Sequence, residues 1–216
     1  MESLPKSHFP IQDCIVFFKR FIAKPGQIGS VMPSSRYLVK NMLSHTDWSK
    51  INNVAELGAG TGVVTSRLLT KLRSHDLLSV FELDKKLRAE LESSLKISIY
   101  ADARDLERIF KPNSLDVIVS SLPWTTLPKQ TSLEILRGIL KCLRPDGQLI
   151  AFQYSWQMYH VFRRLFQSVK ISFVLRNVPP AFVYNCQMPL KIRKNELSQL
   201  FPKNNNVDNN AKKKNL

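Results

Sequence analysis

The sequence predicts an α/β fold in which helices cover both faces of a doubly wound, mostly parallel sheet of seven strands. Three observations predict it. Apolar runs of strand length alternate with helix-like runs from residue 54 to residue 188. Several of these short runs are almost continuously apolar, as in parallel strands that are buried on both faces. The first run, at 54–57, leads into a glycine-rich loop and then directly into a helix-like run, which is a Rossmann-like arrangement.

Length and charge limit the possibilities for organisation and partners. With 216 residues, of which 44% are hydrophobic, the chain fits one large domain with a substantial core. We divide it into an N-terminal, membrane-associating helical segment at 1–45, the α/β domain at 46–201, and a basic tail at 202–216 that we expect to be disordered. The net charge of +15 favours an anionic partner, either nucleic acid or an anionic membrane surface.

Cysteine usage and hydropathy suggest a compartment. Cys14, Cys142 and Cys186 are widely separated and form no C-x-x-C pair, which argues against disulfides and a zinc site and favours a reducing cytosol. No apolar run approaches the roughly 20 residues that span a bilayer, and we see no signal-peptide pattern. We therefore expect a cytoplasmic protein without a metal.

The first structured element is expected at 9–24, where aromatic and aliphatic residues recur at helical spacing beside lysine and arginine. Such a basic amphipathic helix can lie in a membrane interface, and each cation near an anionic leaflet adds roughly 1 kcal/mol of attraction. We expect it to hold the protein on the inner face of the cytoplasmic membrane. A helix that packs on the α/β domain is the alternative. Pro25-Gly26 ends this segment.

The remaining elements follow in order. We predict helices at 36–43, 63–72, 85–94, 131–143 and 161–169 from apolar residues at helical spacing. We predict strands at 54–57, 77–84, 97–100, 115–120, 148–154, 171–175 and 183–188. Ser34 or Ser35 would cap the first helix, and the Pro-Asp-Gly turn at 145–147 separates the fourth helix from its strand.

The loop after the first strand is the main candidate for binding a nucleotide-like ligand. Glu56 precedes Gly58, Gly60 and Gly62, which stand at alternate positions. Glycine adopts positive φ readily and has no Cβ, so a ligand can approach the backbone closely. The helix that follows begins with unpaired N–H groups. The spacing differs from the G-x-G-x-x-G of dinucleotide-binding proteins.

Acidic residues follow the next two strands. Glu82 lies about 20 residues after the glycine loop, where a carboxylate holds a ribose diol. Asp84 is the competing candidate for this role, or it caps the next helix. Asp102, followed by Ala103, comes after the third strand, and its carboxylate can accept from an exocyclic adenine amine. A surface turn residue is the alternative for Asp102.

The fourth strand ends in Ser120-Ser121-Leu122-Pro123-Trp124. Ligands bind at the carboxyl ends of such strands. We place Ser120 with the cofactor and Ser121 and Trp124 in the catalytic set, because a tryptophan face attracts cations. A loop tryptophan that covers the core is the alternative.

These landmarks, taken together, resemble the class I S-adenosylmethionine-dependent methyltransferases. The stretch at 120–124 is similar to the Asn-Leu-Pro-aromatic motif of the rRNA adenine dimethyltransferases, with Ser121 in place of the asparagine. The chain more closely resembles the bacterial phospholipid N-methyltransferases. That resemblance is carried by the segment at 29–36 with its Pro-Ser-Ser-Arg, by Ser-Ser-Leu-Pro at 120–123, and by Asn-x-Pro-Pro-Ala at 177–181.

The resemblance implies that S-adenosylmethionine methylates phosphatidylethanolamine towards phosphatidylcholine through mono- and dimethyl intermediates. It also implies an N-terminal membrane-binding helix. An rRNA adenine dimethyltransferase is the alternative, against which stand Ser121 and the short stretch after Met188, where we expect no separate helical domain. Nucleic acid is therefore not expected as a partner. A non-catalytic binding protein on a relic fold is a third possibility, and the oligomeric state stays open.

The chemistry expected is direct in-line displacement by a neutral amine, accelerated mainly by orientation. We place Tyr154 in the catalytic set as a polar contact or proton relay. The substrate set consists of Ser35, Arg36, Arg176 and Tyr184. Arg176 would hold the lipid phosphate, because a guanidinium forks onto phosphate oxygens. An ion pair at the core edge is the alternative for Arg176.

Overall fold

The computed structural model describes residues 35–97, 99–192, 196–197 and 199–200. Its strands are β1 (Val54–Leu57), β2 (Leu78–Phe81), β3 (Ile99–Tyr100), β4 (Leu115–Ser120), β5 (Leu143–Gln153), β6 (Phe166–Val174) and β7 (Ala181–Pro189). Its α-helices are α2 (Arg36–Leu43), α3 (Val63–Leu69), α4 (Lys85–Leu95), α5 (Leu106–Ile109), α6 (Lys129–Cys142) and α7 (Met158–Leu165).

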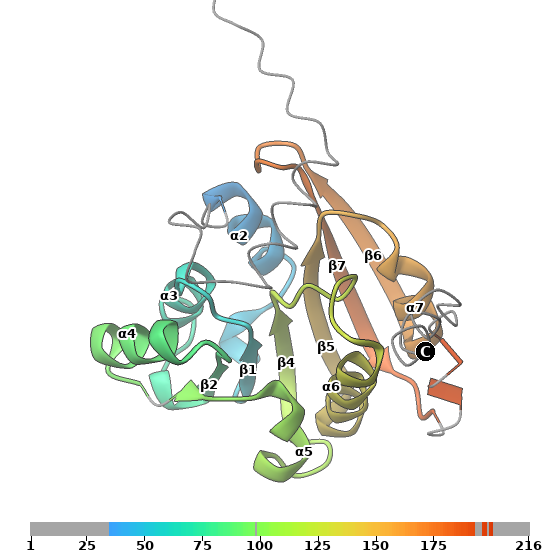
Figure 1. Cartoon of the computed structure of the whole chain (residues 1–216), viewed down its shortest axis with the longest axis horizontal. Helices are drawn as coiled ribbons and strands as arrows, with labels where there is room; N and C mark the ends of the chain where they lie inside the picture. The colour runs from blue at the N-terminus through green and yellow to red at the C-terminus, as the bar shows by residue number, and fades with distance from the viewer. Residues whose placement is uncertain (1–34, 98, 193–195, 198, 201–216) are drawn as a thin grey trace, which may run out of the picture.

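The strands form one seven-stranded sheet in the order β3-β2-β1-β4-β5-β7-β6 (Figure 1). Neighbouring strands run parallel from β3 to β5, whereas β7 runs antiparallel to both β5 and β6. This confirms the doubly wound, mostly parallel sheet predicted from the sequence. The parallel strands therefore end at one common edge of the sheet, which lies at the top of Figure 1.

The core lies in two layers, one on each face of the sheet. Side chains from α2, α3 and α4 pack in one layer, and side chains from α5, α6 and α7 pack in the other. In β4, Val117 and Val119 belong to the first layer and Ile118 to the second. Burial of both faces explains why this strand is apolar at almost every position.

The boundaries of several elements differ from the sequence prediction. The prediction of a helix at 161–169 is wrong for its second half, because α7 ends at Leu165 and β6 begins at Phe166. Residues 166–174 instead pair with β7, from Phe166 opposite Pro189 to Val174 opposite Ala181. Pairing with a distant strand here outweighs the local apolar spacing.

Two further boundaries are corrected, the end of one strand and the end of one helix. The strand expected at 77–84 ends at Phe81, and the helix expected at 63–72 ends at Leu69. The helix at 36–43 is confirmed, and Ser35 caps it by accepting a hydrogen bond from the Leu38 N–H at 3.2 Å. The amphipathic helix predicted at 9–24 and the tail at 202–216 lie outside the described residues. Within the described part of the chain, no helix is long and apolar enough to cross a bilayer.

Candidate active site

The loops after β1, β2 and β4 are joined directly by backbone hydrogen bonds. Gly58 and Ala59 both donate to the Phe81 carbonyl, at 2.9 and 3.1 Å, and Ser121 donates to the Leu57 carbonyl at 2.9 Å. The structure therefore brings the glycine loop, the end of β2 and the Ser120–Trp124 loop together at one edge of the sheet, as the sequence predicted.

The three loop glycines all have positive φ, but they have different neighbours. A Cβ at Gly58 would lie 3.0 Å from Leu122 Cδ2, and a Cβ at Gly62 would collide with the Leu91 side chain. A Cβ at Gly60 would meet nothing within 4 Å. A side chain at Gly58 or Gly62 would thus displace a leucine, whereas Gly60 borders the open space that a ligand would occupy.

Glu82 fixes the position of this loop. Its carboxylate accepts from the Gly60 N–H at 2.7 Å and from the Asp84 N–H at 2.8 Å, and the residue is 9% exposed. Asp84, the competing candidate, instead caps α4 by accepting from the N–H groups of Lys86 and Leu87. Between the two acids, Glu82 is therefore the one that lies against the ligand-facing glycine.

Glu56 lies beneath the loop and not on its surface. It is fully buried, and neither its carboxylate oxygens nor the Thr65 hydroxyl has a hydrogen-bond partner among the described residues. Burial raises the pKa of Glu56 to about 8, the charge of Glu82 adds to the shift, and nearby Thr65 opposes it. Glu56 is therefore closed to solvent in this structure, and its assignment to the cofactor site stays a prediction.

Asp102 and Ala103 follow β3. The Asp102 carboxylate accepts from the Arg104 N–H at 2.9 Å and from the Arg104 guanidinium at 2.6 Å. The hydrogen bond from Arg104 holds the pKa of Asp102 below its usual value, so this carboxylate is charged at neutral pH. Ala103 is buried in the core. Because Oδ2 accepts from both Nε and Nη2 of Arg104, one lone pair on Oδ1 is left for an adenine amine.

Trp124 does not offer an open face to a cation. Its ring is 2% exposed and packs edge-on against Phe162, with 6.3 Å between the ring centroids. Its indole N–H donates to the Ser120 hydroxyl at 3.1 Å. This placement corresponds to the alternative, a loop tryptophan that covers the core, and does not support a direct catalytic role. Ser120 is likewise fully buried and orders this loop.

The two tyrosines of the predicted site differ in exposure. Tyr154, just beyond β5, is half-buried and packs edge-on against Phe152. Tyr184 is fully buried, its hydroxyl donates to the Ser155 carbonyl at 2.9 Å, and burial raises its pKa. Tyr184 therefore anchors the loop after β5 and is closed to a substrate in this structure, while Tyr154 is partly exposed.

A basic cluster forms where α2 meets the loop between β6 and β7. We call Arg36, Tyr37 and Arg176 the arginine–tyrosine cluster. The guanidinium carbons of Arg36 and Arg176 lie 5.0 and 5.3 Å from the centre of the Tyr37 ring. Asn177, which is 2% exposed, accepts from the Ser35 N–H at 3.0 Å and donates to the Pro179 carbonyl. Two predicted segments that are far apart in the sequence thus meet at one place.

Sequence reasoning missed Tyr37, Asn177 and Gln153. Gln153 closes β5 and donates to the Leu122 carbonyl at 2.7 Å, so it ties the β4 loop to β5. A polar residue at the end of an otherwise apolar strand was the signal that could have identified it. Asn177 begins the Asn-x-Pro-Pro-Ala stretch at 177–181, but its role and that of Tyr37 had no local signal, because both depend on a partner far away in the chain.

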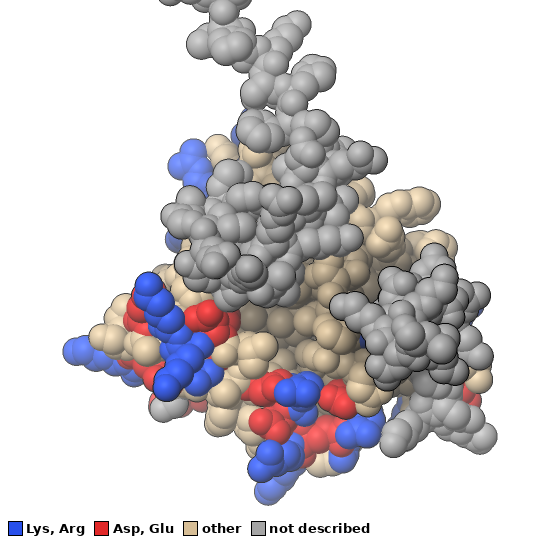
Figure 2. All heavy atoms as spheres, viewed as in Figure 1, with Lys and Arg blue, Asp and Glu red and all other residues tan. Residues whose placement is uncertain are grey.

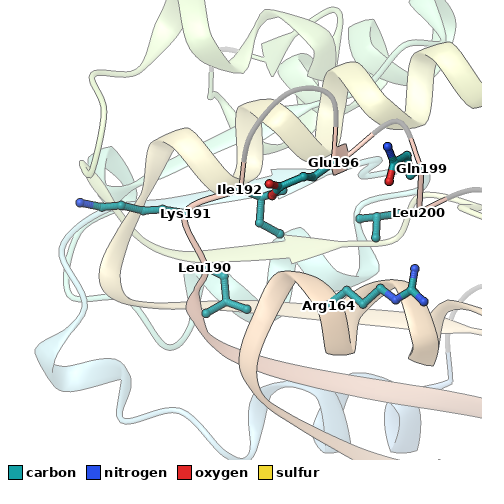
Figure 3. Close-up of a pocket in the computed structure, with 7 residues that line it drawn as sticks. All are labelled: Arg164, Leu190, Lys191, Ile192, Glu196, Gln199 and Leu200. Atoms are coloured by element: carbon teal, nitrogen blue, oxygen red, sulfur yellow. The ribbon is translucent and has the colours of Figure 1, made fainter.

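A groove of about 460 Å³ lies at the opposite end of the sheet. It is lined by side chains of α7 and of the segment after β7, namely Arg164, Leu190, Lys191, Ile192, Glu196, Gln199 and Leu200 (Figure 3). Because β7 runs antiparallel to β5, its last residues lie at the edge where the parallel strands begin. None of the predicted site residues lines this groove.

Comparison with known proteins identifies a family. Residues 28–174 match the family model described as methyltransferase small domain. The chain is also 28% identical over 186 residues to an ornithine lipid N-methyltransferase of Singulisphaera acidiphila. The matched region covers 82% of this chain and 97% of the relative.

Two solved structures have a similar fold. One is a phosphoethanolamine N-methyltransferase of Haemonchus contortus in complex with phosphoethanolamine and S-adenosylhomocysteine. It matches with a TM-score of 0.62 and 14% identity over 89% of this chain and 53% of the other. The second is a 1,6-didemethyltoxoflavin-N1-methyltransferase of Burkholderia thailandensis, with a TM-score of 0.61 and 15% identity over 87% of this chain and 93% of the other.

Proposed function

Since this chain belongs to the methyltransferase small domain family, we propose that it transfers methyl groups from S-adenosylmethionine to the amine of a membrane lipid. The observation that carries the lipid acceptor is the similarity to an ornithine lipid N-methyltransferase along most of both chains. The likeness to the phospholipid N-methyltransferases in three separate sequence segments supports it. The rRNA alternative is not favoured by these relatives.

The residues at the strand ends fit S-adenosylmethionine, which is the cofactor. Gly60 borders open space at positive φ, and the carboxyl groups of Glu82 and Asp102 follow the two neighbouring strands, β2 and β3. These three residues would hold the methionine, ribose and adenine parts in turn. When bound, this cofactor supplies an electrophilic methyl group on a sulfonium, whose C–S bond breaks as the amine attacks in line and S-adenosylhomocysteine leaves.

The acceptor amine is expected beside the ends of β4 and β5. A primary amine has a pKa near ~10.4 in water, so it must lose a proton before it can attack. Ser121 is half-buried, with its N–H fixed on the Leu57 carbonyl, and Tyr154 is half-buried at the end of the next strand. We assign these two side chains to contact with the amine. Orientation by such contacts supplies most of the acceleration.

The arginine–tyrosine cluster is assigned to the anionic part of the lipid headgroup. Arg36 and Arg176 are both exposed and lie against the same ring, so two guanidinium groups border one part of the surface, where an anionic headgroup can bind. Phosphatidylethanolamine, methylated towards phosphatidylcholine, is the acceptor implied by the sequence resemblance. An ornithine lipid is the acceptor suggested by the relative, and both carry an amine near an anion. We place the enzyme peripherally on the inner face of the cytoplasmic membrane.

The test of the function uses the full chain, labelled S-adenosylmethionine and three acceptors offered separately. These are phosphatidylethanolamine and an ornithine lipid, each in anionic vesicles, and unmodified small-subunit rRNA. We expect label in a lipid phase, and chromatography of the products identifies the acceptor and counts the methyl groups. Label in the RNA alone would overturn the proposal.

The assignment of Arg176 is tested in the same assay. Arg176→Ala should raise the apparent KM for the lipid about tenfold while kcat stays within about twofold, because one charge-assisted hydrogen bond contributes roughly 1.5–3 kcal/mol. Arg164→Ala is the matched control, since Arg164 is an exposed arginine at the opposite edge of the sheet. Equal KM values in the two variants would remove Arg176 from the substrate site.

A further inference from the structure

The turn between β6 and β7 exposes a set of apolar side chains. Phe173 is 50% exposed, Leu175 is 72% exposed, and Val178 is 61% exposed. We call these three residues the hairpin tip. Along β6, alternate residues point to opposite sides. On the other side, Val174 is buried and the Ser172 hydroxyl donates to Asn41 of α2. One side of the strand is therefore packed, while the other presents apolar groups to the outside.

The stretch of chain that contains the hairpin tip carries only positive charge. The sequence from 147 to 195 contains no aspartate or glutamate. Arg176 lies within the turn, and Arg36 lies beside it across the Tyr37 ring. Figure 2 shows the acidic side chains gathered mainly over α4 and around α5 and α6, whereas the visible surface over β5, β6 and β7 is uncharged for the most part. An apolar tip bordered by arginine fits an anionic lipid surface.

The tip also lies at the edge of the sheet where the candidate active site is found. Val174 is opposite Ala181, and Phe182 is opposite Gln153 at the end of β5. In Figure 1 the turn projects beyond α2 at this edge. A lipid held in a bilayer at the hairpin tip therefore has its headgroup near the arginine–tyrosine cluster.

We propose that the hairpin tip inserts into the interface of an anionic lipid bilayer, with Arg176 and Arg36 at the level of the headgroups. The choice of a lipid surface as the partner rests on the proposed function. Pairing of two copies through this face would instead bring the same arginines of both chains together, which is unfavourable. The membrane contact is thus distinct from the helix predicted at 9–24.

The test measures sedimentation of the full chain with vesicles of phosphatidylglycerol and phosphatidylcholine. The variant Leu175→Asn/Val178→Thr removes two exposed apolar side chains and leaves Phe173, whose ring packs against Phe182, in place. We expect its partition coefficient to fall about tenfold, as for the loss of one to two apolar side chains from an apolar environment. Met188→Asn is the matched control, because Met188 is a 38% exposed apolar residue at the far end of β7 with φ of 57°, which asparagine tolerates. Equal partition of the wild type and the double variant would overturn the proposal.

Depth of insertion gives a second, independent measurement. Leu175→Trp should gain fluorescence that brominated acyl chains quench, whereas Met188→Trp should not. If neither is quenched, the tip does not enter the bilayer. If light scattering shows that the double variant lowers the molecular mass while vesicle partition is unchanged, the tip is an interface between two copies, and the proposal is wrong.

Activity measurements distinguish a wrong assignment of the membrane contact at the hairpin tip from a wrong assignment of the methyl-transfer function. The double variant should keep wild-type methyl transfer to lipid dispersed in detergent micelles and lose transfer to lipid in vesicles. If the wild type methylates no lipid in either form, yet partitions onto vesicles through the tip, the function fails and the membrane contact stands.

Discussion

In the loop after β1, we expect one glycine to matter for ligand binding and another to matter for stability. Of its three positive-φ glycines, Gly60 alone would present a Cβ to open space, whereas Gly62 lies under Leu91 of α4. A side chain at a left-handed position costs roughly 1–2 kcal/mol in either case. At Gly62, steric overlap with Leu91 adds roughly 1–3 kcal/mol.

We therefore predict different outcomes for two alanine substitutions. Gly60→Ala should lower the free energy of unfolding by about 1–2 kcal/mol and weaken binding of S-adenosylhomocysteine at least tenfold. Gly62→Ala should lower the free energy of unfolding by about 2–5 kcal/mol. Urea unfolding and calorimetry measure the two quantities. Wild-type affinity in Gly60→Ala would show that the ligand does not approach this glycine.

Buried Glu56 makes stability depend on pH. Its pKa is raised to about 8 in the folded protein, so it stays protonated there while the unfolded chain loses the proton above about pH 4.5. The folded state then binds more protons than the unfolded state, and the free energy of unfolding falls as pH rises from about 4.5 to about 8.

Glu56→Gln tests this directly, because glutamine is neutral and has nearly the same shape. We predict that the variant gains stability over the wild type as pH rises from 6 to 8, with a difference on the order of a few kcal/mol at pH 8. Urea unfolding of both proteins at pH 6, 7 and 8 gives the difference, in which the contributions of other groups cancel. A difference that does not change with pH would mean that Glu56 is ionised in the folded state.

At the scale of elements, side-chain amides fasten α2 to the β6–β7 hairpin. Asn177 joins the start of α2 to the turn, and Asn41 accepts from Ser172 farther along the same helix. Only the first of these connections holds the segment that carries Arg36 and Tyr37 against Arg176. The two asparagines are therefore a matched pair, one beside the arginine–tyrosine cluster and one away from it.

We predict that Asn177→Ala and Asn41→Ala each lower the free energy of unfolding by about 1–3 kcal/mol, because buried or half-buried partners lose hydrogen bonds. Asn177→Ala should also raise the lipid KM several-fold, and Asn41→Ala should leave it unchanged. Steady-state kinetics with vesicle-borne lipid distinguish them. If KM rises equally in both variants, general loosening of α2 and not the position of the cluster is responsible.

At the scale of the whole molecule, charge is divided unevenly along the chain. The net charge is +15, and the region from 147 to 195 holds no acid, while the described acids except Glu196 lie at or before residue 146. The segment from 147 to 195, which forms most of β5 and all of β6 and β7, is therefore the part of the chain attracted to an anionic surface.

This division predicts a strong dependence on salt. Raising the salt concentration from 0.05 M to 0.5 M shortens the screening length below about 5 Å. Partition onto phosphatidylglycerol vesicles should fall at least tenfold, while methyl transfer to lipid in neutral micelles should change less than about twofold. Partition that is independent of salt would mean that apolar contact alone carries the association.

The sequence by itself determined the order of the seven strands and of the helices other than α5, the glycine loop, and the acids after β2 and β3. These features depend on local periodicity and on residues within one βα unit, so they can be predicted without knowledge of the partners. The helix at 36–43 with its Ser35 cap is of the same kind.

Only the tertiary structure decided which predicted residues face a ligand. Trp124, Tyr184 and Glu56 looked available in the sequence, yet all three are buried, because the core fills from both faces of the sheet. The pairing of Phe166 with Pro189 turned an expected helix into a strand, and the contact of Ser35 with Asn177 joined two distant segments. Such outcomes depend on contacts between residues far apart in the chain, which local sequence patterns do not encode.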